Sequence, residues 1–492
     1  MSAAVQVNLV PTVAEAKRVS ASRDRPVAQR FVALSQVLGA VLAGSAIAMY
    51  EGTMHWQGIQ WLAMGMACLF GGLILCQTHA AARVSSGLVH CVLGICVAWQ
   101  LTHMALIGLA SGPSCVPILC LRACLLVMTI GLMIALSGRL KLLGCGLLIG
   151  GFAVAGFAAI WTRPHMPRMM DVVHFQHHSS AALLAGKSPY EVRYRNVYHP
   201  NLTGYGPGVT TPDGWLTYSF PYPPTTLMLV VPGYMAGDVR YAHLAALTLA
   251  AGLIILAGRG SAIAILGAGL LLSSPRAAYV VHQGWTEPLL VMLASFVLFA
   301  ALRWRGGLWI AVGLLVSVKQ YLVLVGPLLL MLRGNVKSWG QWWLQMTAAG
   351  VLCVATMLPF VLWSPLEFYR GVVEWQFVQP YRNDSLSIAN LWAISNDQTT
   401  VSGLGGFVAA GVALLLSLWK SPRNVGGFMA SAAVVFVGFF AFNKQAFCNY
   451  YFFVIGLACC AVVGLCHQPS FAQSPTQKAQ RAARGRLSAE GA

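Results

Sequence analysis

Charged residues are scarce in this sequence. Asp, Glu, Lys and Arg make up only 9% of its 492 residues, and hydrophobic residues make up 58%, whereas soluble domains carry about 25% charged residues. This composition excludes an ordinary soluble domain. No two cysteines are spaced as CxxC, and the 13 cysteines all lie in or beside apolar runs. We therefore predict that the cysteines serve as small packing residues and do not form structural disulfides.

Long apolar runs are the main feature that the sequence does have. A membrane-spanning helix needs roughly 20 mostly apolar residues, and runs near that length recur along the chain. They occupy residues 31–50, 57–77, 88–109, 115–136, 142–161, 224–237, 241–258, 261–274, 286–302, 307–332, 341–363, 401–419, 427–442 and 447–466. The run 307–332 predicts two short helices. We therefore predict an all-α polytopic membrane protein with about 12–14 transmembrane helices.

The net charge of +18 comes from basic residues that flank the apolar runs. Lysines and arginines gather before the first run, after the last run and in short loops such as 303–305, which is the positive-inside pattern of membrane proteins. It predicts a multi-pass protein of the plasma (inner) membrane with both termini in the cytoplasm. Contact with anionic membrane lipids explains the charge more simply than a nucleic-acid partner, and we expect no such partner.

Two polar segments, 162–223 and 364–400, interrupt the apolar runs. They contain seven of the 13 acidic residues, and no acidic residue lies deep inside an apolar run. Counting spans inward from cytoplasmic termini puts both segments outside. The predicted organisation is a basic cytoplasmic tail (1–30), an accessory four-helix membrane region (31–141), a catalytic membrane core (142–466) and a second basic cytoplasmic tail (467–492).

The region 224–305 does not fit a simple count of spans. Three apolar runs precede 286–302, yet the basic loop 303–305 should be cytoplasmic, so one run must be re-entrant or cross only half of the membrane. Proline removes a backbone donor, and broken helices are tolerated where they line a cavity. Pro232-Gly233 and Ser273-Ser274-Pro275 are therefore both candidate break points, and the sequence does not choose between them.

Asp171 follows the fifth apolar run and begins a stretch whose apolar residues recur at helical spacing. An aspartate there can cap a helix start. A partly buried carboxylate at the membrane surface can also act as a general base toward a hydroxyl group, and Asp171 is our candidate catalytic residue. His174 and His178 fall on the same helix face. They can hydrogen-bond a substrate or phosphate, bind a metal or form an interfacial surface, and we predict no metal site.

Three cations are candidates for binding a phosphate. Lys319 divides the run 307–332, where a lysine is costly unless it pairs or reaches the interface. A hairpin with both ends inside would put Lys319 at the outer tip, beside a lipid phosphate. Lys444 precedes the last run and can equally mark the interface. Arg382 lies in the second polar segment.

Polar side chains near the same segments extend the candidate substrate site. Tyr222 leads into an apolar run and suits an aromatic interface belt. Gln283 and Glu287 are i, i+4 neighbours at the start of a run, where charged groups usually face a cavity; a helix-start cap is the alternative. Asn383 and Ser385 offer the amide and hydroxyl groups that sugar recognition needs, or they form a polar turn.

These stretches carry a family resemblance in their order and spacing. The motifs are Asp171, Leu184-Ala185-Gly186-Lys187-Ser188-Pro189-Tyr190, Tyr222-Pro223-Pro224, Gln283-Gly284, Lys319, Asn383-x-Ser385, Phe442-Asn443-Lys444 and Tyr450-Tyr451. Over 142–466 the chain resembles the GT-C fold glycosyltransferases that use polyprenyl-phosphate sugars, and most closely the DUF2029 group (glycosyltransferase family 87), which includes bacterial α-mannosyltransferases. That family core starts with one span before the first outer loop, whereas five precede it here.

The resemblance implies a helical GT-C-like bundle that transfers a hexose, expected to be mannose, from a lipid-linked sugar donor to a glycolipid or lipid-linked glycan acceptor. Asp171 would deprotonate the acceptor hydroxyl, Lys319 with Lys444 or Arg382 would hold the leaving phosphate, and Tyr190 would belong to the substrate site. No cofactor is implied. A polysaccharide polymerase or ligase stays open, as does a lipid-linked-glycan transporter or flippase, although a transporter predicts ionisable residues deep in the spans.

Overall fold

The computed structural model describes residues 13–48, 50–76, 84–110, 115–162, 170–198, 205, 208–398 and 400–467. Of the predicted basic tails, residues 13–30 belong to the first helix, whereas 1–12 and 468–492 lie outside these ranges. Within them the chain is helical, and its only extended pairings are three isolated β-bridges. Eight helices are long and apolar enough to cross a membrane, and four further apolar helices have 10–17 residues. The chain thus has the helices of a polytopic membrane protein, with fewer full-length spans than the predicted 12–14.

The N-terminal third contains five long helices and one short turn. They are α1 (Val13–Ala48), η1 (Tyr50–Gly52), α2 (Trp56–Ile74), α3 (Ser86–Ala110), α4 (Cys115–Ser137) and α5 (Lys141–Trp161). Each long helix contains one apolar run of the sequence, since a chain in lipid must satisfy its backbone polar groups internally.

The middle of the chain alternates short and long helices. They are α6 (Asp171–Leu184), η3 (Pro189–Glu191), α7 (Pro224–Met235), α8 (Arg240–Ala257), α9 (Ala262–Leu272), α10 (Ala277–His282), α11 (Glu287–Arg303), η4 (Arg305–Gly307), α12 (Leu308–Val318) and η5 (Gln320–Asn335). The run 307–332 forms two short helices, as predicted, and they are separated at Lys319, whose backbone is extended.

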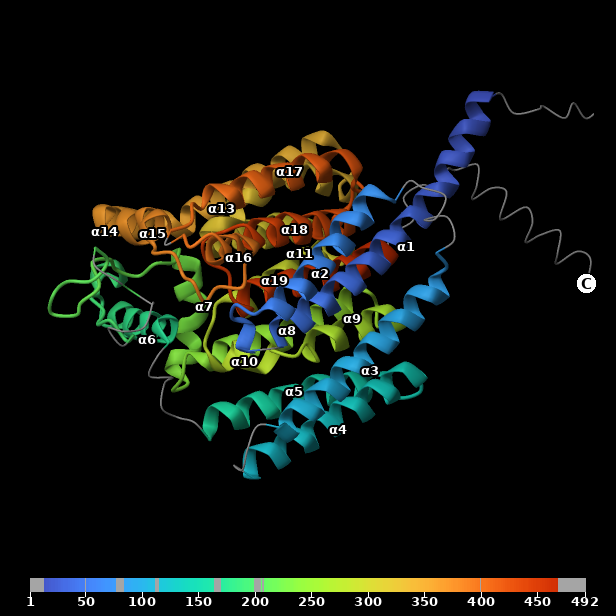
Figure 1. Ribbon diagram of the computed structural model, residues 1–492. Helices are drawn as coiled ribbons and strands as arrows, with labels where there is room; N and C mark the ends of the chain where they lie inside the picture. The colour runs from blue at the N-terminus through green and yellow to red at the C-terminus, as the bar shows by residue number, and fades with distance from the viewer. Residues whose placement is uncertain are drawn as a thin grey trace, which may run out of the picture.

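The C-terminal part begins with a long helix and ends with a buried one. Its elements are α13 (Trp339–Trp363), α14 (Pro365–Tyr369), η6 (Arg370–Glu374), α15 (Trp375–Val378), α16 (Ile388–Ser395), α17 (Leu404–Lys420), α18 (Val425–Ala441) and α19 (Cys448–Cys466). Figure 1 shows α6, α7, α14 and α15 gathered at one end of the bundle, here named the α6 end, and α1 starting at the opposite end.

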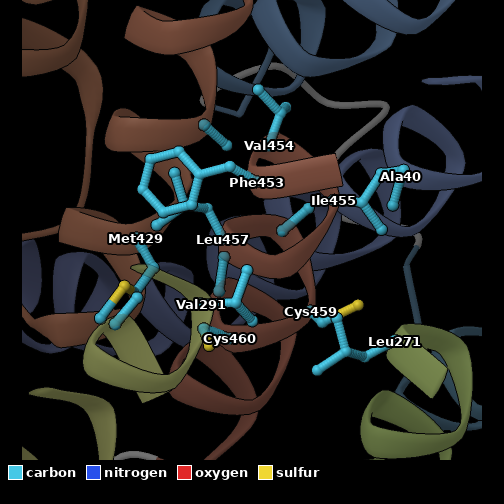
Figure 2. Close-up of a cluster of buried hydrophobic side chains, with 14 of the residues drawn as sticks. Ala40, Leu271, Val291, Met429, Phe453, Val454, Ile455, Leu457, Cys459 and Cys460 are labelled. Carbon is cyan, nitrogen blue, oxygen red and sulfur yellow. The ribbon is translucent and has the colours of Figure 1, made fainter. Parts of the chain in front are cut away.

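The helix α19 forms the centre of the bundle. It packs against α1, α9, α11 and α18, and nearly all of its side chains are buried. Figure 2 shows its residues Phe453 to Cys460 surrounded by side chains of these neighbours. A Cβ added at Gly456 would lie 2.5 Å from a methyl group of Val291, so the glycine lets α11 and α19 approach closely, as small residues do between membrane helices.

The helix α7 is a short apolar helix at the α6 end of the bundle. It has only 12 residues, and both of its ends contact the α6 region. Before its first turn, the Tyr222 carbonyl accepts a hydrogen bond from the Tyr190 hydroxyl at 2.8 Å. In its last turn, the Tyr234 ring lies 4.9 Å from the His177 ring of α6. Both ends of α7 therefore lie beside the same region of the chain, and we expect α7 to be the apolar run between 224 and 305 that does not cross the membrane.

The path of α7 leads to a labelling prediction. Single cysteines at Asp213 and Met235, both exposed, should react with an impermeant maleimide in intact cells or spheroplasts, because both lie at the α6 end and that end is predicted to face outside. A cysteine at Arg139, in the α4–α5 connection, should react only after lysis. Labelling is measured as the excess over the unsubstituted protein. Protection of Met235→Cys with labelling of Asp213→Cys would mean that α7 crosses.

Candidate active site

A polar cavity of about 230 Å³ lies at the α6 end of the bundle. Its polar lining comes from widely separated parts of the chain and includes Thr53, Asp171, Tyr198, Tyr205, Tyr222, Thr286, Glu287, Lys319, Arg382, Asp384, Gln445, Asn449 and Tyr450. The two polar segments of the sequence meet here. The Ser219 hydroxyl of the first donates to the Glu367 carbonyl of the second at 3.2 Å, so the two segments lie at the same end of the bundle, and their position outside the membrane stays a prediction.

Asp171 occupies the first position of α6. The next residues Val172, Val173 and Phe175 are buried, and this packing fixes the start of the helix. One carboxylate oxygen, Oδ1, accepts a hydrogen bond from the Val172 N–H at 2.7 Å, and a helix N-terminus favours a negative charge. The other oxygen, Oδ2, accepts from the Tyr205 hydroxyl. Asp171 thus contacts the helix start and the cavity at once.

A group of tyrosines surrounds this carboxylate. The Tyr218 ring stacks on Trp375 with ring centroids 3.3 Å apart, and Tyr205 lies 5.7 Å from the same tryptophan. Burial raises the pKa of Tyr205 well above its ordinary value, and the negative charge of Asp171 raises it further. Burial and Asp171 raise the pKa of Tyr198 in the same way. Both hydroxyl groups therefore stay protonated near neutral pH and can donate to Asp171.

Lys319 enters the cavity from the break between α12 and η5. Its Nζ donates to Thr286 Oγ1 at 2.5 Å and to Glu287 Oε1 at 3.1 Å, and it lies 4.6 Å from the centre of the Tyr222 ring. The lysine and the glutamate are both buried. We expected a lipid phosphate as the partner of Lys319, and the structure shows that Glu287 and Thr286 already pair with it.

Arg382 is the second cation of the cavity. Its Nε and Nη2 donate to the two carboxylate oxygens of Asp384 at 2.8 and 2.6 Å. The guanidinium also lies 5.0 Å from the centre of the Phe447 ring, so the Arg382 side chain is fixed on two sides. A bidentate arginine–carboxylate pair of this kind holds the guanidinium in one orientation.

The charges of the cavity lining nearly balance. Asp171, Glu287 and Asp384 supply three carboxylates, and Lys319 and Arg382 supply two cations. The cations are already paired with Glu287 and Asp384, whereas Asp171 accepts hydrogen bonds from the Val172 N–H and the Tyr205 hydroxyl. Of the acidic groups in the cavity, Asp171 is therefore best placed to accept a proton.

Two histidines of α6 lie together but outside the cavity lining. The His174 and His178 rings stack 6.0 Å apart, as their spacing on one helix face predicts. Burial lowers the pKa of His174 below its ordinary value, and the charge of His178 adds to this effect. Among the residues that the structure describes, no group of three or more His, Cys, Asp or Glu side chains could hold a metal ion.

Three other candidates do not line the cavity. Tyr190 is fully buried and orders the backbone beside Tyr222. Gln283 caps the end of α10. The Lys444 ammonium donates to the backbone carbonyls of Phe377 and Gln379 at 2.9 and 2.6 Å, so it fastens the α18–α19 connection to the second polar segment.

The Asn383–Ser385 element also lies beside the cavity rather than in its lining. The Asn383 carbonyl accepts a hydrogen bond from Asn390 Nδ2 at 2.7 Å, and Ser385 is fully buried. Their role in the structure is to shape the turn that carries Arg382 and Asp384. A role for either side chain in sugar binding stays a prediction.

An apolar groove of about 580 Å³ adjoins the cavity. It is lined by residues of η5, α17 and α18 and by the segment 372–379, with Lys444 among them. Five residues line both spaces, namely Tyr321, Gln376, Gln379, Gln445 and Tyr450. The polar cavity and the apolar groove are therefore neighbouring parts of one larger site.

Several lining residues were not predicted from the sequence. Tyr198 and Tyr205 lie where tyrosine is dense, between 190 and 222, which was a usable signal, whereas Trp375 has no such signal. Thr53 lies in a region that showed no sign of chemistry.

No protein family, curated protein or solved structure matches this chain.

Proposed function

We propose that this chain is a membrane glycosyltransferase. It transfers a hexose, with mannose as the first candidate, from a polyprenyl-phosphate sugar to a glycolipid or lipid-linked glycan on the extracytoplasmic face. The observation that carries the proposal is the meeting of Asp171, Lys319 and Arg382 in one cavity. A carboxylate that can take a proton and two cations that can attract a phosphate are the groups that this reaction needs.

In the proposed reaction, the acceptor hydroxyl oxygen forms a bond to the anomeric carbon of the sugar. Asp171 takes the hydroxyl proton, as a general base does. The bond between the anomeric carbon and the phosphate oxygen breaks, and the electron pair leaves with polyprenyl phosphate. Attack from the side opposite the phosphate inverts the anomeric carbon.

The leaving phosphate gains negative charge as its bond to the sugar breaks. Lys319 and Arg382 would stabilise that charge electrostatically, as fixed donors do in a water-poor site. Both cations already have carboxylate partners, so the phosphate would share them rather than find them free. The reaction as proposed requires no cofactor beyond the lipid-linked donor.

The two neighbouring spaces suit the two parts of such a donor. The cavity is smaller than the roughly 300–1,000 Å³ typical of pockets for drug-sized ligands, which fits one sugar ring and its phosphate. The apolar groove beside it can hold isoprenoid units by van der Waals packing, which is the interaction available to apolar groups that are already in lipid. Holding donor and acceptor together would itself supply much of the rate.

A transfer assay tests the proposal. Purified protein in lipid nanodiscs is incubated with radiolabelled polyprenyl-phosphate mannose, glucose or galactose and a total lipid extract. We expect label to move from one donor into a larger glycolipid, with release of polyprenyl phosphate. Two outcomes would contradict the proposal. The first is release of the donor sugar into water only. The second is movement of lipid across the bilayer of proteoliposomes without sugar transfer. The second outcome would favour a flippase, and growth of a long polymer would favour a polymerase.

A further inference from the structure

The connection between α1 and α2, residues Tyr50–His55, contributes to the wall of the cavity. Among the described residues that line it, Thr53 is the only one that precedes Met170. The N-terminal helices therefore reach the site although the sequence before residue 142 carries no evident chemistry. The contacts of this connection indicate what it does there.

The connection lies against α19, and the end of α1 just before it is fixed by Arg276. Arg276, just before α10, donates to the carbonyls of Ile47 and Ala48 at 3.1 and 2.7 Å, which fixes the end of α1. Gly52 has a φ of +74°, and a Cβ added there would lie 2.7 Å from the Cβ of Cys448. The positive φ and the close approach both favour glycine at this position.

The same connection pairs with the segment that carries Arg382. The Met54 N–H donates to the Asp384 carbonyl at 2.8 Å, and Thr53 forms an antiparallel bridge with Ser385. The side chain of Asp384 in turn holds Arg382 by two hydrogen bonds. A continuous chain of contacts thus runs from Gly52, through the backbone of Asp384, to the guanidinium in the cavity.

We infer that the α1–α2 connection is a positioning element that sets the place of Arg382, and through it the binding of the donor phosphate. This inference rests on the proposed function. It gives the first two helices a part in donor recognition: they supply a template for the turn 382–385, so that Arg382 meets the phosphate without a loss of ordering entropy at each binding event.

The test compares donor and acceptor requirements in substituted proteins. Gly52→Ala should push the connection away from Cys448 and raise the donor KM roughly 3- to 30-fold, the range of indirect couplings through contacts, with kcat and the acceptor KM close to wild type. Thr53→Val should act in the same direction but more weakly, since it removes only the hydroxyl that donates to the Tyr50 carbonyl at 2.7 Å. Gly71→Ala is the matched control, because nothing lies within 4 Å of a Cβ there.

A double substitution separates positioning from a merely structural role. If the connection acts through Arg382, Gly52→Ala should change the donor KM little in an Arg382→Met background. If the two substitutions instead raise the donor KM by factors that multiply, the inference is overturned. Equal rises in the donor and acceptor KM would also overturn it, as would a loss of thermal stability without a change in KM. A wild-type protein without transfer activity would remove the proposed function and this inference with it, whereas an active wild type with unchanged variants would remove only the inference.

Discussion

Asp171→Asn should lower the transfer rate by about 100-fold or more, while the protein still accumulates in the membrane. An asparagine keeps the shape of the side chain, and its carbonyl can still accept the Val172 N–H that now lies 2.7 Å from Oδ1. The start of α6 should therefore survive. An amide does not take up a proton near neutral pH, so the acceptor hydroxyl would lose its base. The measurement is steady-state transfer per mole of folded protein.

Asp213→Asn is the matched control for this experiment. Asp213 lies in the same polar segment but is exposed and does not line the cavity, so its substitution should leave the transfer rate unchanged. Near-normal transfer by Asp171→Asn would refute the role of base. Asp171 would then be explained by its contact with the helix start alone.

The long apolar helices of this chain could be predicted from sequence, whereas short helices such as α10 and α16 could not. The run 142–161 became α5 (Lys141–Trp161), and the run 341–363 became α13 (Trp339–Trp363). The reason is physical: an apolar run in lipid has few ways to satisfy its backbone other than a helix. Helix length was less predictable, because runs such as 261–274 form only 11 helical residues.

The candidate site could be predicted in part. Asp171, Glu287, Lys319 and Arg382 were all named from the sequence and line one cavity, since charged residues beside membrane helices tend to face cavities. The pairing between Lys319 and Glu287 was not predicted, because the two residues are 32 positions apart and only the packing of the helices brings them together.

The contribution of the first two helices had no signature in the sequence. Thr53 meets Ser385 through a backbone bridge, and backbone pairing places little demand on residue type. For a related reason, the sequence did not show which apolar run between 224 and 305 fails to cross the membrane. Pro232 lies inside α7 and Pro275 lies between α9 and α10. Proline therefore marks both places and does not show which run returns to the membrane face where it began.

Lys319→Met should raise the donor KM by about 10- to 100-fold, since a hydrogen bond to a charged group contributes roughly 1.5–3 kcal/mol. The acceptor KM should change much less. The same substitution leaves Glu287 buried without its cation, which should cost about 3–5 kcal/mol of stability. Thermal unfolding and donor KM are therefore measured together, with Lys337→Met as a control for an exposed lysine. Lys319→Arg should be only partly tolerated, because a planar guanidinium does not replace a compact ammonium.

The double variant Lys319→Met with Glu287→Gln distinguishes the two roles of the lysine. It removes both buried charges, so most of the lost stability should return, because replacing a whole buried ion pair is often nearly neutral. The donor KM should stay high, since the phosphate still lacks its ammonium. If the double variant instead recovers both the stability and the donor KM, Lys319 serves only to neutralise Glu287. Arg382 would then be the one remaining cation of the described cavity lining that could hold the phosphate.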